Sequence, residues 1–132
     1  MLKKLSVKTN SKVELVDITS KIKKTVKESG IKSGMLLIHV PHTTAAVTIN
    51  ENADPDVKRD IKKEINKIVP FEDNYSHLEG NSAAHIKSSL FGSDQSLIIE
   101  NNDIILGTWQ GIYFCEFDGA RNRNIYLKII EG

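Results

Sequence analysis

The chain has a single cysteine, Cys115, and only three prolines among its 132 residues. One cysteine forms no intrachain disulfide, and it excludes a thiolate metal cluster within one chain. No stretch approaches the roughly 20 apolar residues that a helix needs to span a bilayer, and the N-terminal residues lack the apolar core of a secretory signal. From these absences we expect a soluble cytoplasmic protein.

A large excess of charge of either sign is also missing. Eighteen Lys and Arg side chains stand against seventeen Asp and Glu, which leaves a formal net charge of +1. Non-specific binding to a phosphate backbone needs concentrated positive charge, so a nucleic-acid partner is disfavoured. The length suits one compact domain over residues 1–132, and no repeat or linker interrupts it.

Runs of apolar residues predict strands and helices in irregular alternation. Residues 3–16 are predicted to form a hairpin that turns at residues 9–11, because apolar residues alternate on both sides of a polar cluster. Further strands are predicted over residues 34–40, 43–51, 95–100, 103–117 and 123–130. This pattern lacks a regular βαβα order. We therefore expect an α+β fold with a mixed, mostly antiparallel sandwich or barrel-like sheet.

Two or three helices are expected to pack outside this sheet. The first covers residues 18–29 and ends at Gly30, and the second starts at Asp54 with Pro55 in the first helical position. After Pro70 comes a polar loop of about ten residues, which is longer than most connections in compact domains. A third helix is predicted over residues 82–91, between a cap at Asn81 or Ser82 and Gly92.

The four histidines are the first candidates for chemistry. His39 lies in the middle of a predicted strand and is interpreted as structural. His42 follows a proline bend, His77 lies in the long loop and His85 is one turn into the third helix. Loops and bends present side chains, and three neutral imidazoles leave a tetrahedral Zn²⁺ one open position. The spacing shows no local metal motif, so separate structural roles remain the alternative.

Other polar residues have two interpretations each. Gly80, Asn81 and Ser82 at the start of the third helix suit either an anion site or an ordinary helix cap. Arg121 and Arg123 either bind phosphate or are merely solvated on a hairpin.

Two further features lie in or beside predicted strands. Glu51 is either a buried acid or base, or the solvated end of a strand. The glycines that flank Trp109 and Gln110 indicate a bulge or a close approach of another group. The apolar run 103–117 that contains them is predicted to meet a second subunit in part.

Three segments, PHTTAAVTINENADPDV, NYSHLEGNSAAHIKSSLFG and LGTWQGIYFCEFDGARNR, resemble the YjbQ family, which is described as having thiamine-phosphate synthase activity. The resemblance implies an α+β fold, a homotrimer and a metal, most simply Zn²⁺, held by His42, His77 and His85. It also implies an enzyme that couples a pyrimidine diphosphate to a thiazole phosphate.

Under this resemblance each candidate residue takes a role. Glu51 and His42 are the expected catalytic residues, and Mg²⁺ is the alternative metal for a diphosphate substrate. The residues expected to hold phosphate or stack on a ring are Gly80, Asn81, Ser82, Trp109, Arg121 and Arg123. A non-catalytic trimeric module that binds a small phosphorylated metabolite or a metal is the competing hypothesis.

Overall fold

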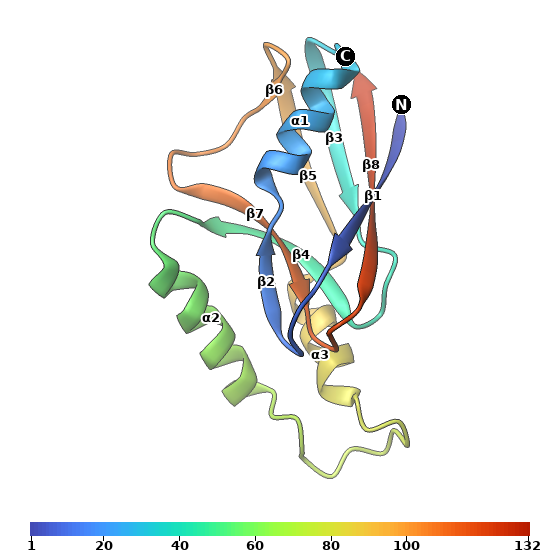
Figure 1. The fold of residues 1–132 in the computed structure, drawn as a ribbon, viewed down its shortest axis with the longest axis vertical. Coiled ribbons are helices and arrows are strands. Elements are labelled where there is room, and N and C mark those ends of the chain that lie inside the picture. Colours follow the sequence, from blue (N-terminus) through green and yellow to red (C-terminus); the bar gives the residue numbers. More distant parts are fainter.

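The computed structural model describes all 132 residues as two curled antiparallel sheets with three helices (Figure 1). Along the chain, the strands and helices are β1 (Leu2–Lys8), β2 (Glu14–Asp17), α1 (Thr19–Ser29), β3 (Ser33–His39), β4 (Ala45–Glu51), α2 (Pro55–Ile68), α3 (Ser82–Phe91), β5 (Asp94–Glu100), β6 (Asp103–Ile104), β7 (Gln110–Glu116) and β8 (Asn122–Glu131). The larger sheet has the order β1-β8-β3-β5-β6, and the smaller has the order β2-β7-β4. The expected α+β class with antiparallel sheets and three helices is confirmed.

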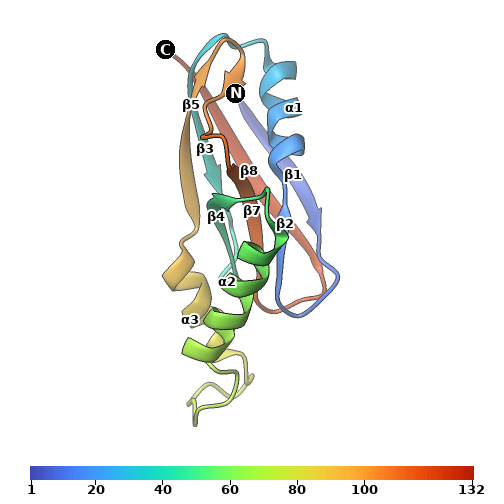
Figure 2. The same ribbon diagram turned by 90° about the vertical axis from the view of Figure 1, so that its left-hand side faces the viewer.

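The smaller sheet is the middle layer of the fold, with the larger sheet and α1 on one face and α2 and α3 on the other (Figure 2). The strand β7 explains this position, because its side chains alternate between two apolar clusters. Ile112 and Phe114 pack in the larger cluster, whereas Tyr113 and Cys115 pack in the smaller one against α2 and α3. A strand that is buried on both faces has a continuous apolar sequence.

The double burial of β7 bears on the expected subunit contact. The apolar residues 112–115 are covered by the chain's own layers, whereas Ile105 and Trp109 of the same predicted strand are more than half exposed. The predicted strand over residues 103–117 is also interrupted, since β6 ends at Ile104 and β7 begins at Gln110. Gly111 does mark a close approach, because a Cβ there would lie 2.3 Å from Nδ2 of the Asn52 side chain.

The predicted hairpin over residues 3–16 is wrong, although both of its strands exist. β1 pairs with β8 in the larger sheet, and β2 pairs with β7 in the smaller sheet. Alternating apolar residues identify a strand but not its partner, and here both partners lie about a hundred residues further along the chain. The segment between β1 and β2 therefore passes from one sheet to the other.

The start of α2 and the end of α1 match their predicted capping residues. Asp54 accepts a hydrogen bond from the Asp56 amide at 2.9 Å, and Gly30 ends α1 with the left-handed φ of 71°. The second helix ends before Pro70, and the residues from Pro70 to Asn81 form the expected long loop. The helices α2 and α3 thus hold this loop at one end of the molecule (Figure 1).

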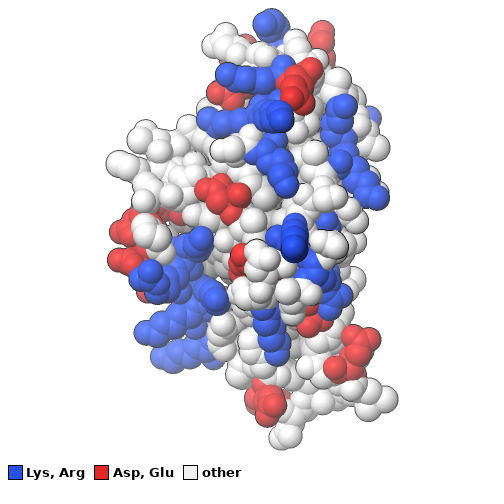
Figure 3. Space-filling model, viewed as in Figure 1, with Lys and Arg blue, Asp and Glu red and all other residues white.

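None of the three helices has the length and apolar character needed to cross a membrane. Figure 3 shows basic side chains over α1 and along α2, with acidic side chains among them. Mixed signs on one face agree with the balanced composition of the chain.

Candidate functional site

A cleft of about 730 Å³ opens between the β3–β4 connection, the loop before α3 and the β7–β8 turn. All four histidines of the chain line it: His39, His42, His77 and His85. Of its fourteen lining residues only one is hydrophobic, so the cleft suits a polar ligand. We call it the histidine cleft.

His42 is held by the backbone of β8. Its Nε2 accepts a hydrogen bond from the Asn124 amide at 3.0 Å, which assigns the proton of the neutral ring to Nδ1. Burial and then the charge of Arg123 lower the pKa of His42, so its ring is neutral at pH 7. In this orientation only Nδ1 remains for a ligand.

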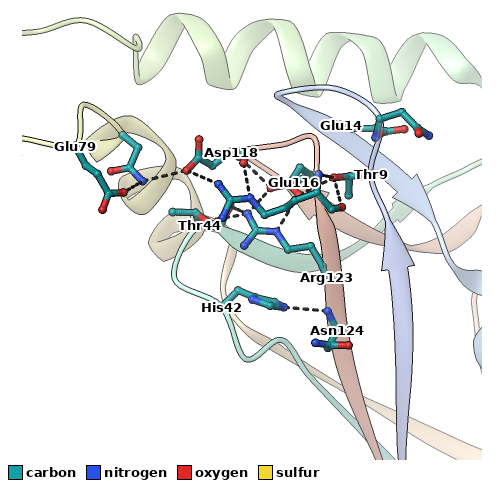
Figure 4. Close-up of polar contacts among 12 residues, drawn as sticks. Thr9, Glu14, His42, Thr44, Glu79, Glu116, Asp118, Arg123 and Asn124 are labelled. Atoms are coloured by element: carbon teal, nitrogen blue, oxygen red, sulfur yellow. Dashed lines mark hydrogen bonds and ion pairs between the residues drawn. The ribbon is translucent and has the colours of Figure 1, made fainter.

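A buried ion pair lies directly beneath the cleft (Figure 4). Arg123 donates from Nε to Glu116 Oε1 at 2.9 Å and from Nη2 to Glu116 Oε2, and Nη2 also donates to Thr44 Oγ1 at 2.8 Å. Glu116 accepts two further hydrogen bonds, from Thr9 Oγ1 and from the Asp118 amide. Buried charges are stable when they are paired and hydrogen-bonded, and this pair shares two hydrogen bonds.

The two arginines of the β7–β8 turn therefore differ. Arg123 is 3% exposed and neutralised by Glu116, so the alternative that it is merely solvated is wrong. Its Nη1 takes no part in these bonds, and Arg123 still lines the cleft. Arg121 lies before β8 and is half exposed, with its Nη2 3.2 Å from Asp118 Oδ2. Arg121 is thus the more available cation.

Asn81 occupies the cap position of α3, but its side chain makes no capping bond. Its Nδ2 donates instead to Glu79 Oε2 at 3.1 Å and to Asp118 Oδ2 at 3.0 Å (Figure 4). Two carboxylates beside a helix start oppose an anion there. The structure therefore disfavours the expected phosphate site at this helix start.

Gly80 and Ser82 flank Asn81 but do not line the histidine cleft. Gly80 borders a hollow of the long loop, where its amide donates to the His77 carbonyl at 3.2 Å. Ser82 borders another hollow, beside Tyr75 and His85. Gly80 and Ser82 are thus neighbours of a cleft residue, Asn81, without lining the cleft themselves.

His77 and His85 are close neighbours, with ring centres 5.6 Å apart and planes at 89°. Two imidazoles that bind one zinc ion at about 2.0 Å have ring centres roughly 5 Å apart in a tetrahedral arrangement. The separation of the two ring centres is close to this value. However, no group of three or more His, Cys, Asp or Glu side chains is positioned to hold a metal ion, and Nε2 of His42 already has a partner.

Glu51 and Trp109 lie far from the cleft. Glu51 is at the opposite end of β4 from Ala45, about 20 Å away at the usual rise per residue of a strand. Trp109 lies beside it, since its carbonyl accepts from the Asn52 amide at 3.0 Å, and its side chain is 62% exposed. The structure does not bring either residue to the histidines.

Several cleft residues were not predicted from the sequence. His39 had been interpreted as a structural strand residue, yet it is exposed on the outer face of the larger sheet and lines the cleft. Glu79 and Asp118 were available in the sequence as carboxylates next to the predicted histidine and arginine motifs. Nothing in the sequence pointed to Glu116 and Thr44 as site residues. Both bond to Arg123, and only the fold brings the three together.

A family model for "UPF0047 protein YjbQ-like" matches residues 3–132. The chain belongs to the YjbQ family. It is 53% identical to the UPF0047 protein YugU of Bacillus subtilis, over 98% of this chain and 99% of that protein. It is 56% identical to a UPF0047 protein of Methanocaldococcus jannaschii, over 98% of this chain and 94% of that one.

Solved structures of the YjbQ family have the same fold. One from Clostridium acetobutylicum is 55% identical with a TM-score of 0.94, and covers 97% of this chain and 99% of its own. Another is a YbjQ-like protein of unknown function from Sulfolobus solfataricus, 32% identical with a TM-score of 0.95, which covers 100% of this chain and 97% of its own.

The expected thiamine-phosphate synthase activity must be corrected. The curated relatives are described only as UPF0047 proteins, and the Sulfolobus protein is one of unknown function. Membership of the YjbQ family therefore does not assign the coupling of a pyrimidine diphosphate to a thiazole phosphate. The histidine cleft has to be interpreted from its own chemistry.

Proposed function

We propose that the histidine cleft is the active site of an enzyme that acts on a small phosphorylated metabolite with the help of a divalent metal ion. The single observation that carries this proposal is the meeting of all four histidines in one polar cleft. They come from a strand, a bend, a loop and a helix, so no local structural need explains their convergence.

His77 and His85 are the residues that would hold the metal, since their rings have a suitable separation. Imidazole donors favour Zn²⁺ over Mg²⁺, which prefers oxygen. A bound divalent ion would supply positive charge to a phosphate oxygen. His42 is proposed as a hydrogen-bond donor from Nδ1 rather than as a third ligand, because Nε2 is engaged by Asn124.

Charge explains why metal and phosphate would bind together. Arg121 and Arg123 are opposed by Glu79, Asp118 and the underlying Glu116, which leaves one net negative charge in and beneath the cleft. A divalent ion reverses that sign and makes the cleft attractive to an anion. Arg121 and Nη1 of Arg123 then offer hydrogen bonds to phosphate oxygens.

The test starts with protein that has been dialysed against Zn²⁺ and then against metal-free buffer. Elemental analysis should find about one zinc per chain, and His77→Ala should remove it while circular dichroism stays unchanged. His39→Ala is the matched control, since His39 lines the same cleft outside the His77 and His85 pair. Equal zinc loss in both variants, or no zinc in the parent, overturns the metal assignment.

Phosphorus NMR separates binding from turnover. A panel of phosphorylated metabolites should show line broadening with the zinc-loaded protein and none with the metal-free protein. Over hours, a new phosphorus signal from one member of the panel would support an enzyme. Broadening without any new signal across the panel contradicts the enzymatic part of the proposal and leaves a binding protein.

Self-association as a homotrimer is proposed from a second observation. Met35, Ile98 and Ile130 are adjacent in register on the outer face of the larger sheet, and each is about half exposed. Exposed apolar residues grouped in this way are typical of subunit contacts. Sedimentation equilibrium should give three chains per particle, and Ile98→Asp should lower that number. Leu90→Asp, at a similarly exposed residue of α3, is the control that should leave it unchanged.

A further inference from the structure

A second hollow of about 360 Å³ adjoins the histidine cleft between the end of α3 and the start of β4. We call it the serine groove, because Ser88, Ser89 and Ser93 line it, together with Thr43 and Gly92. His42, His85, Thr43 and Ser93 line both hollows, so the two lie side by side. A ligand that reaches across these shared residues would contact both.

Ser88 is the unusual residue of the groove. It is 8% exposed, and its Oγ has no hydrogen-bond partner. A helical serine ordinarily donates to the carbonyl four residues earlier, as Ser89 does to His85 at 2.9 Å. A buried hydroxyl without a partner is destabilising by itself, so such groups are rare in folded proteins. Ser88 nevertheless lines the groove, so its hydroxyl lies beside the space that a ligand would occupy.

The rest of the groove determines which chemistry it would accept. Its lining contains no Lys, Arg, Asp or Glu. Four of its eight residues carry hydroxyls, and the other polar side chains are the imidazoles of His42 and His85. Gly92 leaves the floor open, since a Cβ there would meet nothing within 4 Å. Hydroxyls both donate and accept, so they match a ligand group that does the same. A charged group would lack a counter-charge, and an apolar group would leave these hydroxyls unpaired.

We infer that the serine groove binds a neutral, hydroxyl-bearing part of the substrate, such as a sugar or polyol, while the phosphate of the same molecule lies in the histidine cleft. This inference rests on the proposed function and narrows it from phosphorylated metabolites to sugar phosphates and related polyol phosphates. Ser88 is the specificity-determining residue, because the ligand's hydroxyl would supply the partner that its Oγ lacks.

The experiment compares two probes on the zinc-loaded protein by isothermal titration calorimetry. Methyl phosphate presents the phosphate alone, and ribose 5-phosphate adds the hydroxyl-bearing ring. Ribose 5-phosphate should bind about tenfold more tightly or better, because two or more added hydrogen bonds each contribute roughly two- to tenfold in affinity.

Two variants test the groove and one controls for it. Ser88→Ala should lower the affinity for ribose 5-phosphate by about three- to tenfold and leave methyl phosphate unchanged. Ser89→Phe fills the groove from an exposed residue that does not line the cleft, and it should remove the preference for the sugar altogether. Ser96→Ala removes an exposed hydroxyl on β5 away from both hollows and should change neither affinity.

The pattern of results separates this inference from the proposal beneath it. If both probes bind equally, or if Ser88→Ala and Ser89→Phe leave the preference intact, the groove is not a sugar subsite and the phosphate site stands. If neither probe binds the zinc-loaded protein, the proposed function fails, and the sugar subsite fails with it.

Discussion

One wall of the histidine cleft, which we call the strand wall, is formed by His42, Thr44 and Arg123 above the buried Glu116, and hydrogen bonds to the sheets fix it. The loop wall, residues 71–81 with His77 and Glu79, is mostly exposed. The strand wall thus holds its polar groups in place before any ligand arrives, whereas the loop wall presents them on a segment with little burial. Groups that orient a ligand belong on the first wall, and groups that close over it belong on the second.

The largest expected difference between the walls is in stability. Glu116→Gln removes the charge that neutralises Arg123, and an unpaired buried charge costs about 3 to 5 kcal/mol. Glu79→Gln makes the same chemical change on the exposed loop wall and should alter the free energy of unfolding by less than about 0.5 kcal/mol. Urea unfolding measures both. Similar changes in the free energy of unfolding for the two variants would contradict a strand wall that is more firmly held than the loop wall.

Acid should reduce this contrast. Burial alone raises the pKa of Glu116, but hydrogen bonds from Arg123, the Asp118 amide and Thr9 outweigh it, so its pKa lies below the ordinary 4.5. Its contribution to stability is therefore complete above pH 4.5 and is lost as the pH falls through the folded pKa.

The stability advantage of the wild type over Glu116→Gln should accordingly shrink as the pH falls below 4.5 and through the folded pKa of Glu116, by about 1.4 kcal/mol for each unit by which the pKa is lowered. Urea titrations at a series of pH values measure it. An advantage that stays constant over this range would mean that Glu116 is not the titrating group.

Local sequence signals predicted most of the fold. Asp54 with Pro55 located the start of α2, and Gly30 located the end of α1, because capping depends on neighbouring residues. The hairpin over residues 3–16 failed because strand pairing is set by distant partners. The break between β6 and β7 was also missed, because a continuous run of apolar residues does not indicate which of them pair within a sheet.

The candidate site was predictable only in part. His42, His77 and His85 were identified as presented side chains, and the structure does bring them to one cleft with His39. The burial of Arg123 was missed, because Glu116 lies seven residues away across a turn. The other partners come from distant segments, since Thr9 bonds Glu116 and Thr44 bonds Arg123. Glu51 was misplaced because strand parity predicts a face and says nothing about which end of the strand meets the histidines.

Phe71 should give the next largest effect, because it anchors the loop wall. The Nζ atoms of Lys12 and Lys87 lie 3.9 Å and 3.6 Å from its ring centre, and Lys87 also donates to Asn66 Oδ1 at 2.7 Å. Phe71→Leu removes both cation–π contacts and should destabilise the protein by about 1 to 2 kcal/mol. Hydrogen exchange of residues 72–80 should also become faster, since their anchor is lost.

Leu78→Ala is the control for Phe71→Leu, because Leu78 is a fully exposed residue of the same loop. It should leave both the stability and the exchange rates unchanged. If Phe71→Leu behaves like this control, the two lysines do not anchor the loop.

The smallest effect comes from the histidines themselves, one on each wall. His42→Ala deprives the partly buried Asn124 amide of its acceptor and should cost about 1 kcal/mol, with faster hydrogen exchange at Asn124. His77→Ala, on the exposed loop, should stay within about 0.5 kcal/mol of the parent. His42→Gln places an amide oxygen where Nε2 was and should restore part of the protection of Asn124. Equal exchange at Asn124 in the parent and in His42→Ala would contradict the fixed orientation of His42, and with it the assignment of Nδ1 as the atom that faces a ligand.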